Sequence, residues 1–324
     1  MPGQLRRLRG WTGRCTTQRM SSSYRSRYLV SRPCCADPCA QAGEACSFQV
    51  AWAINPHMQI GAVQTRLAAR QHGAFVRELE RAGAAVDAIP FVHGAFDSVF
   101  SKDNAVLVAR DHGGIEALLA RPRHAERQIE QEARAASLAS LGVRIAGTSD
   151  EPLEGGDIVM QPAGGGAFVG HGFRSSRGAA HDLEAFLDRA VTGLELCDPR
   201  LYHLDMVLSV LDDGTALVCE DALTEAAFRR LVAHPAITSI LRVPLREALA
   251  FGVNLVQVGK TIVWGADAPA TTRALTARGY RVRKVALDQF HLGGGSAACL
   301  VSRVHRQVAA DGGSRASAPA STAA

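Results

Sequence analysis

Short apolar runs alternate with amphipathic helical stretches along most of this chain. Apolar residues at helical spacing over 60–79 predict a helix that ends near Gly83. The same spacing predicts further helices at 126–141, 177–191, 224–233 and 269–278. Short apolar runs predict strands at 28–30, 48–54, 85–89, 105–109, 143–146, 158–160, 167–169, 204–210, 215–219, 237–243, 255–258, 261–263, 281–285 and 297–304.

The order of these elements repeats. Each predicted helix follows two short strands and precedes another, roughly five times over, with a period of about 50 residues. This strand-strand-helix-strand unit is typical of an α/β repeat architecture that closes on itself, rather than of a doubly wound sheet. No linker interrupts the pattern, so we expect a single domain over residues 27–308.

The composition of the chain also predicts where in the cell the protein is located. With 324 residues, of which 47% are hydrophobic, the chain can fill a sizeable core. No apolar run approaches the roughly 18 residues of a membrane span, and no segment has the apolar centre of a secretory signal. We therefore expect a cytoplasmic protein that has no membrane partner.

The net charge of +5 comes mainly from the two ends of the chain. Eight arginines precede the first acidic residue, Asp37. Residues 1–26 are expected to be a disordered basic leader, with a mitochondrial transit peptide and a nucleic-acid-binding arm as alternatives. Residues 309–324 are rich in Ala and Ser and are expected to form a disordered tail.

The eight cysteines include an irregular cluster between Cys34 and Cys46. This cluster could bind a metal, but its spacing matches no zinc pattern and lacks a paired C-x-x-C, so we expect no metal site. Disulfides are not expected without a secretory signal. Neither G-x-G-x-x-G after a strand nor a P-loop sequence occurs, so nucleotide binding is unsupported.

Three consecutive glycines, Gly293 to Gly295, precede a predicted buried strand that contains Cys299. Glycine allows a left-handed backbone and the close approach of another group, so the run could deliver a side chain to a crowded place. The simpler interpretation is that Cys299 is a small core residue.

Acidic and histidine residues interrupt the apolar pattern in three segments. They are Glu154 and Asp157 around a Gly-Gly pair, His203 and Asp205 on one face of a predicted strand, and Asp97 and Asp103 before strand 105–109. Each one alone could be a turn cap or a satisfied core residue. Together they offer a thiol nucleophile a base, a carboxylate that orients the base, and further carboxylates for a cationic substrate.

Four ordered motifs complete this set: AINPHM at 53–58, LEGGD at 153–157, HLD at 203–205 and GGGSAAC at 293–299. They resemble the motifs of the guanidino-group-modifying (pentein) superfamily, which contains arginine deiminase, dimethylarginine dimethylaminohydrolase and the amidinotransferases. The resemblance covers about residues 27–304 and implies a five-bladed α/β propeller with pseudo-fivefold symmetry.

The resemblance also implies a catalytic group. Cys299 matches the nucleophile, His203 the general acid/base, and Glu154 the carboxylate that orients the histidine. No cofactor is implied, and the expected partner is a small guanidino molecule rather than nucleic acid.

A second group of residues is implied to bind substrate. Asp103 and Asp205 match acids that hold the guanidinium, and Asp97 matches a substrate contact of the dimethylargininases. Asp157, in the second motif, is also assigned to substrate binding. Arg121 and Arg174 fall where the family binds the α-carboxylate of the substrate; either could otherwise be a surface arginine.

Two departures from the family pattern concern the substrate. Lys102 stands where dimethylargininases carry an acid and deiminases an arginine, and the chain has dimethylargininase length yet carries Asp205 like a deiminase. The first hypothesis is therefore a hydrolase acting on arginine or an arginine derivative, which gives a ureido product such as citrulline. The alternatives are an amidinotransferase with an amine acceptor and a catalytically silent guanidino-binding protein.

Overall fold

The computed structural model describes residues 26–35, 46–111 and 113–306. The predictions of a disordered leader and tail fall outside these residues, apart from Ser26. Among the described residues, every helix is too short or too polar to cross a lipid bilayer.

The described strands form three-stranded units that share one pairing pattern. In each unit the first strand pairs antiparallel with the second, and the second pairs parallel with a third. A parallel pair requires a crossover, and a helix provides it in every unit. The five units have these bounds: β15 (Val301–Arg306), β1 (Arg27–Ser31), α1 (Thr65–Arg81) and β2 (Ala85–Ile89); β3 (Ala105–Ala109), β4 (Ile115–Leu119), α2 (Ala125–Gln128), α3 (Gln131–Ser140) and β5 (Val143–Thr148); β6 (Ile158–Met160), β7 (Ala167–His171), α4 (Ala179–Leu187) and β8 (Val191–Glu195); β9 (Leu208–Val210), β10 (Thr215–Val218), α5 (Glu225–Val232) and β11 (Ser239–Arg242); and β12 (Val256–Val258), β13 (Thr261–Trp264), α7 (Pro269–Ala277) and β14 (Arg281–Lys284).

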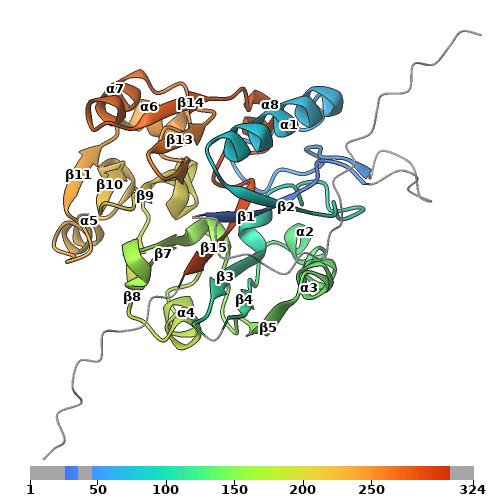
Figure 1. Cartoon of the computed structure of the whole chain (residues 1–324), viewed down its shortest axis with the longest axis horizontal. Helices are drawn as coiled ribbons and strands as arrows, with labels where there is room; N and C mark the ends of the chain where they lie inside the picture. Colours follow the sequence, from blue (N-terminus) through green and yellow to red (C-terminus); the bar gives the residue numbers. More distant parts are fainter. Residues whose placement is uncertain (1–25, 36–45, 112, 307–324) are drawn as a thin grey trace, which may run out of the picture.

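The two ends of the described chain meet in one of these units. β15 pairs antiparallel with β1 and parallel with β3, and so joins two units into a six-stranded sheet. In Figure 1 the blue β1 and the red β15 lie side by side near the middle, and the helices α1, α3, α4, α5 and α7 lie towards the periphery. The fold is thus α/β with mixed sheets, and its pairing agrees with the repeat expected from the sequence. The closed five-bladed arrangement itself stays a prediction.

Several predicted elements are wrong at the places where the apolar pattern is interrupted. Residues 48–54 form no strand, and the helix predicted at 126–141 is two helices, α2 and α3. The strand predicted at 297–304 begins only at Val301. The strand predicted at 204–210 starts with a 3₁₀ turn, Leu204–Met206, because the Leu204 N–H donates to the carboxylate of Asp157 instead of a neighbouring strand. Short apolar runs cannot by themselves distinguish a strand from a buried turn.

Candidate active site

Loops and 3₁₀ turns, rather than regular strands, carry the polar side chains of the candidate site. Three such turns are Ser101–Asn104, Gly155–Asp157 and Leu204–Met206, and the second of them packs against both of the others. Residues 293–300 and 54–58 complete the wall of one narrow cavity. Its lining includes Ile54, Asn55, Met58, Asp97, Phe100, Asp103, Arg127, Arg174, Tyr202, His203, Gly293, Gly294, Gly295 and Cys299.

The glycine run lets the chain pass between aromatic rings and a polar loop. A Cβ on Gly295 would lie 2.3 Å from Phe100, and Gly294 has φ +83° and lies against Asn55. Any larger side chain at Gly295 would have to displace a buried ring. The run therefore brings Cys299 into the cavity, on a turn that precedes β15 rather than on the predicted strand.

The Cys299 thiol is buried between an amide and a carboxylate. Asn254 Nδ2 donates to Sγ at 3.2 Å, and Sγ lies 3.8 Å from Asp205 Oδ2. Burial raises the pKa of the Cys299 thiol well above its ordinary value, and the negative charges of Asp205 and Asp103 raise it further. Without a bound substrate, the thiol is therefore neutral at physiological pH, although the charge of Lys102 lowers its pKa slightly. Asn254 had not been identified from the sequence; its amide also accepts the Ala298 N–H at 2.8 Å.

His203 lines the same cavity and forms a buried pair with Glu154. Their Nε2 and Oε2 atoms are 2.9 Å apart. Burial lowers the pKa of His203, but Asp103 and the hydrogen bond to Glu154 outweigh it and raise this pKa to about 9. Burial also opposes ionisation of Glu154, yet His203 and the nearby Arg174 hold its pKa well below the usual range. At neutral pH the pair is therefore an imidazolium beside a carboxylate.

Arg127 contacts the acids that the resemblance assigns to substrate binding. Its Nη1 lies 3.0 Å from Asp103 Oδ2, its Nε lies 3.6 Å from Asp97 Oδ1, and Glu130 contacts the same Nε at 2.5 Å. The other oxygen of Asp103 accepts the Gly156 N–H at 2.9 Å. Burial raises the pKa of Asp97 to about 6, although the charge of Arg127 opposes this. Arg127 had not been identified from the sequence, where an arginine within a predicted helix carries no signal of burial.

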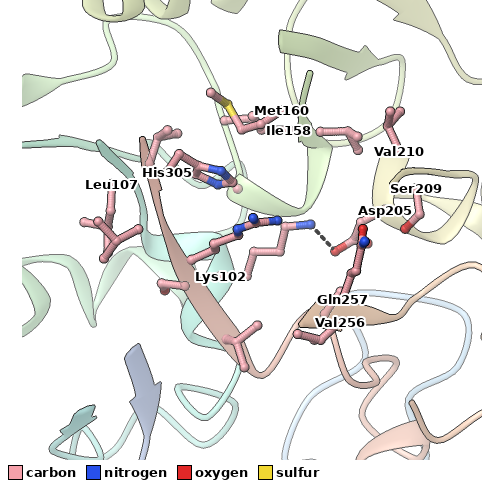
Figure 2. Close-up of a pocket in the computed structure, with 18 of the residues that line it drawn as sticks. Lys102, Leu107, Ile158, Met160, Asp205, Ser209, Val210, Val256, Gln257 and His305 are labelled. Carbon is pink, nitrogen blue, oxygen red and sulfur yellow. Dashed lines mark hydrogen bonds and ion pairs between the residues drawn. The ribbon is translucent and has the colours of Figure 1, made fainter. Parts of the chain in front are cut away.

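Lys102 forms an ion pair with Asp205, at 2.8 Å between Nζ and Oδ2. Figure 2 shows this pair among the side chains that line a second cavity of about 410 Å³, together with His305 and Gln257. Asp205 thus stands between that cavity and the Cys299 thiol, and its Oδ1 is buried without a hydrogen-bond partner among the described residues. The predicted placement of His203 and Asp205 on one face of a strand is wrong, because both lie at a 3₁₀ turn.

The remaining three predicted residues have different environments. Arg174 lines the cavity, where it bonds Glu154 at 3.0 Å and stacks over the ring of Tyr202 at 4.7 Å. Arg121 does not line this cavity; its side chain donates to the carbonyl of Asp150 in an exposed contact.

Asp157 is fully buried, and its two oxygens accept the backbone N–H groups of Ser175 and Leu204 at 2.9 and 3.0 Å. It therefore fixes the turn that carries His203, instead of facing the cavity. Burial raises its pKa to about 6.

A metal ion is disfavoured in this cavity. Asp103, Glu154 and His203 have donor atoms within 4.8 Å of one another and could in principle hold one. However, a guanidinium group already contacts each of the two carboxylates: Arg127 contacts Asp103 and Arg174 contacts Glu154. The arrangement suits proton transfer beside a buried thiol, and the recognition of an organic cation.

Comparison with known proteins identifies the family. The model of the family described as N,N dimethylarginine dimethylhydrolase, eukaryotic, matches residues 48–306. The N(G),N(G)-dimethylarginine dimethylaminohydrolase of Mycobacterium tuberculosis is 34% identical over 259 residues, which are 80% of this chain and 83% of that protein. The bifunctional arginine dihydrolase/ornithine cyclodeaminase AgrE of Nostoc sp. is 29% identical over 265 residues, which are 81% of this chain and 37% of AgrE.

Solved structures agree with this assignment. The N-terminal domain of ArgZ, a cyanobacterial arginine dihydrolase bound to its product, has a TM-score of 0.78 and 26% identity, covering 87% of this chain and 99% of that chain. The matches extend over the segments that carry Glu154, His203 and Cys299. This chain therefore belongs to the eukaryotic N,N dimethylarginine dimethylhydrolase family, within the guanidino-group-modifying superfamily.

Proposed function

We propose that this protein hydrolyses the guanidino group of arginine or an arginine derivative and releases a ureido product such as citrulline. One observation carries the proposal: the buried Cys299 thiol shares its cavity with Asp103 and with His203, which pairs with the buried Glu154 behind it. Relatives named for the hydrolysis of dimethylarginine and of arginine support the same class of substrate.

The first step is recognition of a cation. Asp103 and Asp97 already contact one guanidinium, that of Arg127, so they provide the charge and geometry that this group requires. Asp205 is expected to be a further acceptor for the cation, since its Oδ2 lies 3.8 Å from Cys299 Sγ and its Oδ1 has no hydrogen-bond partner among the described residues. A bound guanidinium brings positive charge next to Cys299, lowers the pKa of the thiol and allows its proton to leave to solvent.

The chemical steps use the thiolate and the imidazolium. Cys299 Sγ bonds to the guanidino carbon, the C–N bond to the leaving amine breaks, and His203 gives its proton to that amine. A covalent thiouronium remains on the cysteine. Water then attacks the same carbon, His203 accepts one proton from it, a second proton leaves to solvent, and the C–S bond breaks to return the thiolate and release the ureido product. Glu154 stabilises the charged imidazole throughout, and no cofactor takes part.

The substrate follows from how many N–H groups the site requires. A dimethylated nitrogen has no N–H to donate, so acceptors on both Asp103 and Asp205 favour an unmethylated or singly substituted terminal group. An unsatisfied buried carboxylate costs about 1–3 kcal/mol or more, which is enough for a preference of about tenfold or greater. The ion pair with Lys102 partly satisfies Asp205, and the family assignment points instead to dimethylarginine.

A substrate screen tests the proposal. The full chain is incubated with arginine, mono- and dimethylated arginines and agmatine, and the ureido product is detected by colorimetry. We expect at least one substrate to be turned over by the wild-type protein and not by Cys299→Ser, and Asp205→Ala to lower kcat/KM for arginine more than for asymmetric dimethylarginine. A parallel reaction with glycine detects transfer to an amine. No turnover of any guanidino compound would overturn the proposal, and a new guanidino product with glycine would favour the amidinotransferase.

We also propose that the five three-stranded units surround one axis as the blades of a propeller. The shared pairing pattern and the meeting of the chain ends in the β15–β1–β2 unit support this arrangement. A crystal structure in which the five units do not surround one axis would contradict it.

A further inference from the structure

Two cysteines and a histidine lie together outside the active site. The ligand atoms of Cys35, Cys46 and His93 are all within 4.8 Å of one another, and Cys46 Sγ is 3.2 Å from His93 Nδ1. Both cysteines are half-buried and His93 is exposed, so solvent reaches one side of the group. None of the three lines the catalytic cavity.

Backbone pairing holds the two thiols on adjacent segments. The Cys35 N–H donates to the carbonyl of Cys46 at 2.8 Å, and an isolated antiparallel bridge joins the neighbouring Cys34 and Ser47. The geometry of the two cysteines therefore comes from the fold and does not require a bond between them. His93 approaches from a different segment of the chain, after β2.

The donor set matches a thiophilic cation. Two thiolates and an imidazole are preferred ligands of Zn²⁺, with bonds of about 2.3 Å to sulfur and about 2.0–2.1 Å to nitrogen. At these lengths the ligand atoms of a tetrahedral ion lie roughly 3.5–3.8 Å apart. The observed group needs to contract by about 1 Å or less at its widest separation to reach that geometry.

We propose that Cys35, Cys46 and His93 provide three ligands of a Zn²⁺ site. The site is structural: it lies at the start of the segment that leads to Asn55 and four residues before Asp97, both of which line the catalytic cavity. Two hydrogen bonds also join these segments. The Gln49 N–H donates to the Phe96 carbonyl at 3.2 Å, and Trp52 Nε1 donates to Asp97 Oδ2 at 3.3 Å. A bound ion stabilises this junction.

This proposal departs from the sequence prediction of no metal site. The cysteine spacing alone matches no zinc pattern, and the third ligand lies 47 residues beyond Cys46, where only the fold brings it close. Metal ligands that lie so far apart in the sequence form no recognisable zinc-binding motif.

Metal content of the full chain tests the proposal. After incubation with Zn²⁺ and dialysis against a weak chelator, we expect about one zinc per chain by mass spectrometry. Cys35→Ser, Cys46→Ser and His93→Ala should each lose most of it, whereas Cys197→Ser, which changes an exposed cysteine elsewhere, should keep it. Cys299→Ser should also keep it, which separates this site from the catalytic thiol.

Two measurements on the wild-type chain do not depend on the folding of variants. Co²⁺ in place of Zn²⁺ should give a thiolate-to-cobalt charge-transfer band, and Zn²⁺ should protect Cys35 and Cys46 from alkylation. Any one of four results would overturn the proposal. Two concern variants: zinc content that is unchanged in Cys35→Ser and His93→Ala, or zinc that is lost only in Cys299→Ser. The other two concern the wild-type chain: equal alkylation with and without Zn²⁺, or a Cys35–Cys46 disulfide in the isolated protein.

Discussion

The charges around single residues set the protonation states on which the proposed chemistry depends. Cys299 is held neutral by burial and by the acids beside it, whereas His203 is held charged by Asp103 and Glu154. The unliganded site therefore holds a neutral thiol and a charged imidazolium, instead of a thiolate and a neutral imidazole. In the proposed reaction, the cation of the substrate activates the nucleophile only when it is bound.

Cys299→Ser should lower kcat by at least about 10³-fold, since a serine hydroxyl is far less ionised than a thiol and the imidazolium of His203 cannot serve as its base. The fold should persist, because the two side chains are similar in size. Steady-state kinetics and thermal unfolding measure both effects, with Cys197→Ser as the matched control. If Cys299→Ser retained near-normal turnover, the nucleophile would have to be assigned elsewhere.

Glu154→Gln should lower kcat/KM by about 10²-fold, because it removes a charge and a hydrogen bond that stabilise the imidazolium of His203. It should also lower the pKa of His203, so the loss of activity at alkaline pH should begin at a lower pH than in the wild type. The pH profile of kcat/KM separates this effect from a general structural one. The control is Glu225→Gln, whose side chain is 81% exposed in an ion pair on α5. An unshifted profile would mean that another group sets the charge of His203.

Among the secondary-structure elements, the regular strands form the apolar core and the 3₁₀ turns position the polar groups of the cavity. The strands of the repeated units bury the apolar residues, and the turns Ser101–Asn104, Gly155–Asp157 and Leu204–Met206 bring buried polar groups to the cavity. The turns are fixed by side chain to backbone hydrogen bonds, such as those of Asp157 and Asp103. Small changes in these turns should therefore affect activity more than stability.

Gly156→Ala tests this separation. A Cβ at this position would lie 2.4 Å from His203 Nδ1 and 2.8 Å from Asp103 Oδ1, so the His203 ring must shift from its present position. We expect a loss of activity of 10²-fold or more, on the order expected for a misplaced proton-transfer group. Gly142→Ala is the control: it has φ +78° and no neighbour within 4 Å, and should destabilise the fold by roughly 1–2 kcal/mol while leaving kcat unchanged. Full activity of Gly156→Ala would show that the turn tolerates displacement.

For the whole molecule, stability and catalysis are linked through the buried charges. The catalytic cavity holds several acids and bases that are removed from solvent in the folded state and exposed on unfolding. Their pKa values therefore enter the free energy of unfolding as well as the reaction. The Cys299 turn leads directly into β15, and the pairing of β15 with β1 joins this turn to the strand at the other end of the described chain.

The pH dependence of unfolding should contain a contribution from His203. Its pKa rises from 6.5 in the unfolded chain to about 9 in the fold, a difference that contributes about 3 kcal/mol. This stabilisation is fully present below pH 6.5 and is lost as the pH rises through 9. Urea unfolding at pH 6 and pH 9.5 should therefore show a decline that is about 3 kcal/mol smaller in His203→Asn than in the wild type. Equal declines would mean that His203 titrates alike in both states.

The sequence by itself determined the α/β class, the strand-strand-helix-strand order and the set of acids, histidine and cysteine from which the cavity is built. These are local or motif-level properties, because an apolar period and a glycine-rich motif are written in consecutive residues. Only the tertiary structure decided which of these side chains meet. It placed Asp157 on backbone N–H groups, Arg121 away from the cavity and Lys102 against Asp205.

The tertiary structure also supplied Arg127 and Asn254, which no local pattern marked, and turns where strands had been predicted. The reason is physical: a buried charge or amide is stabilised by partners from distant segments, and their approach depends on packing. Residue spacing predicted which chemistry the chain could support, and packing decided which atoms face each other to perform it.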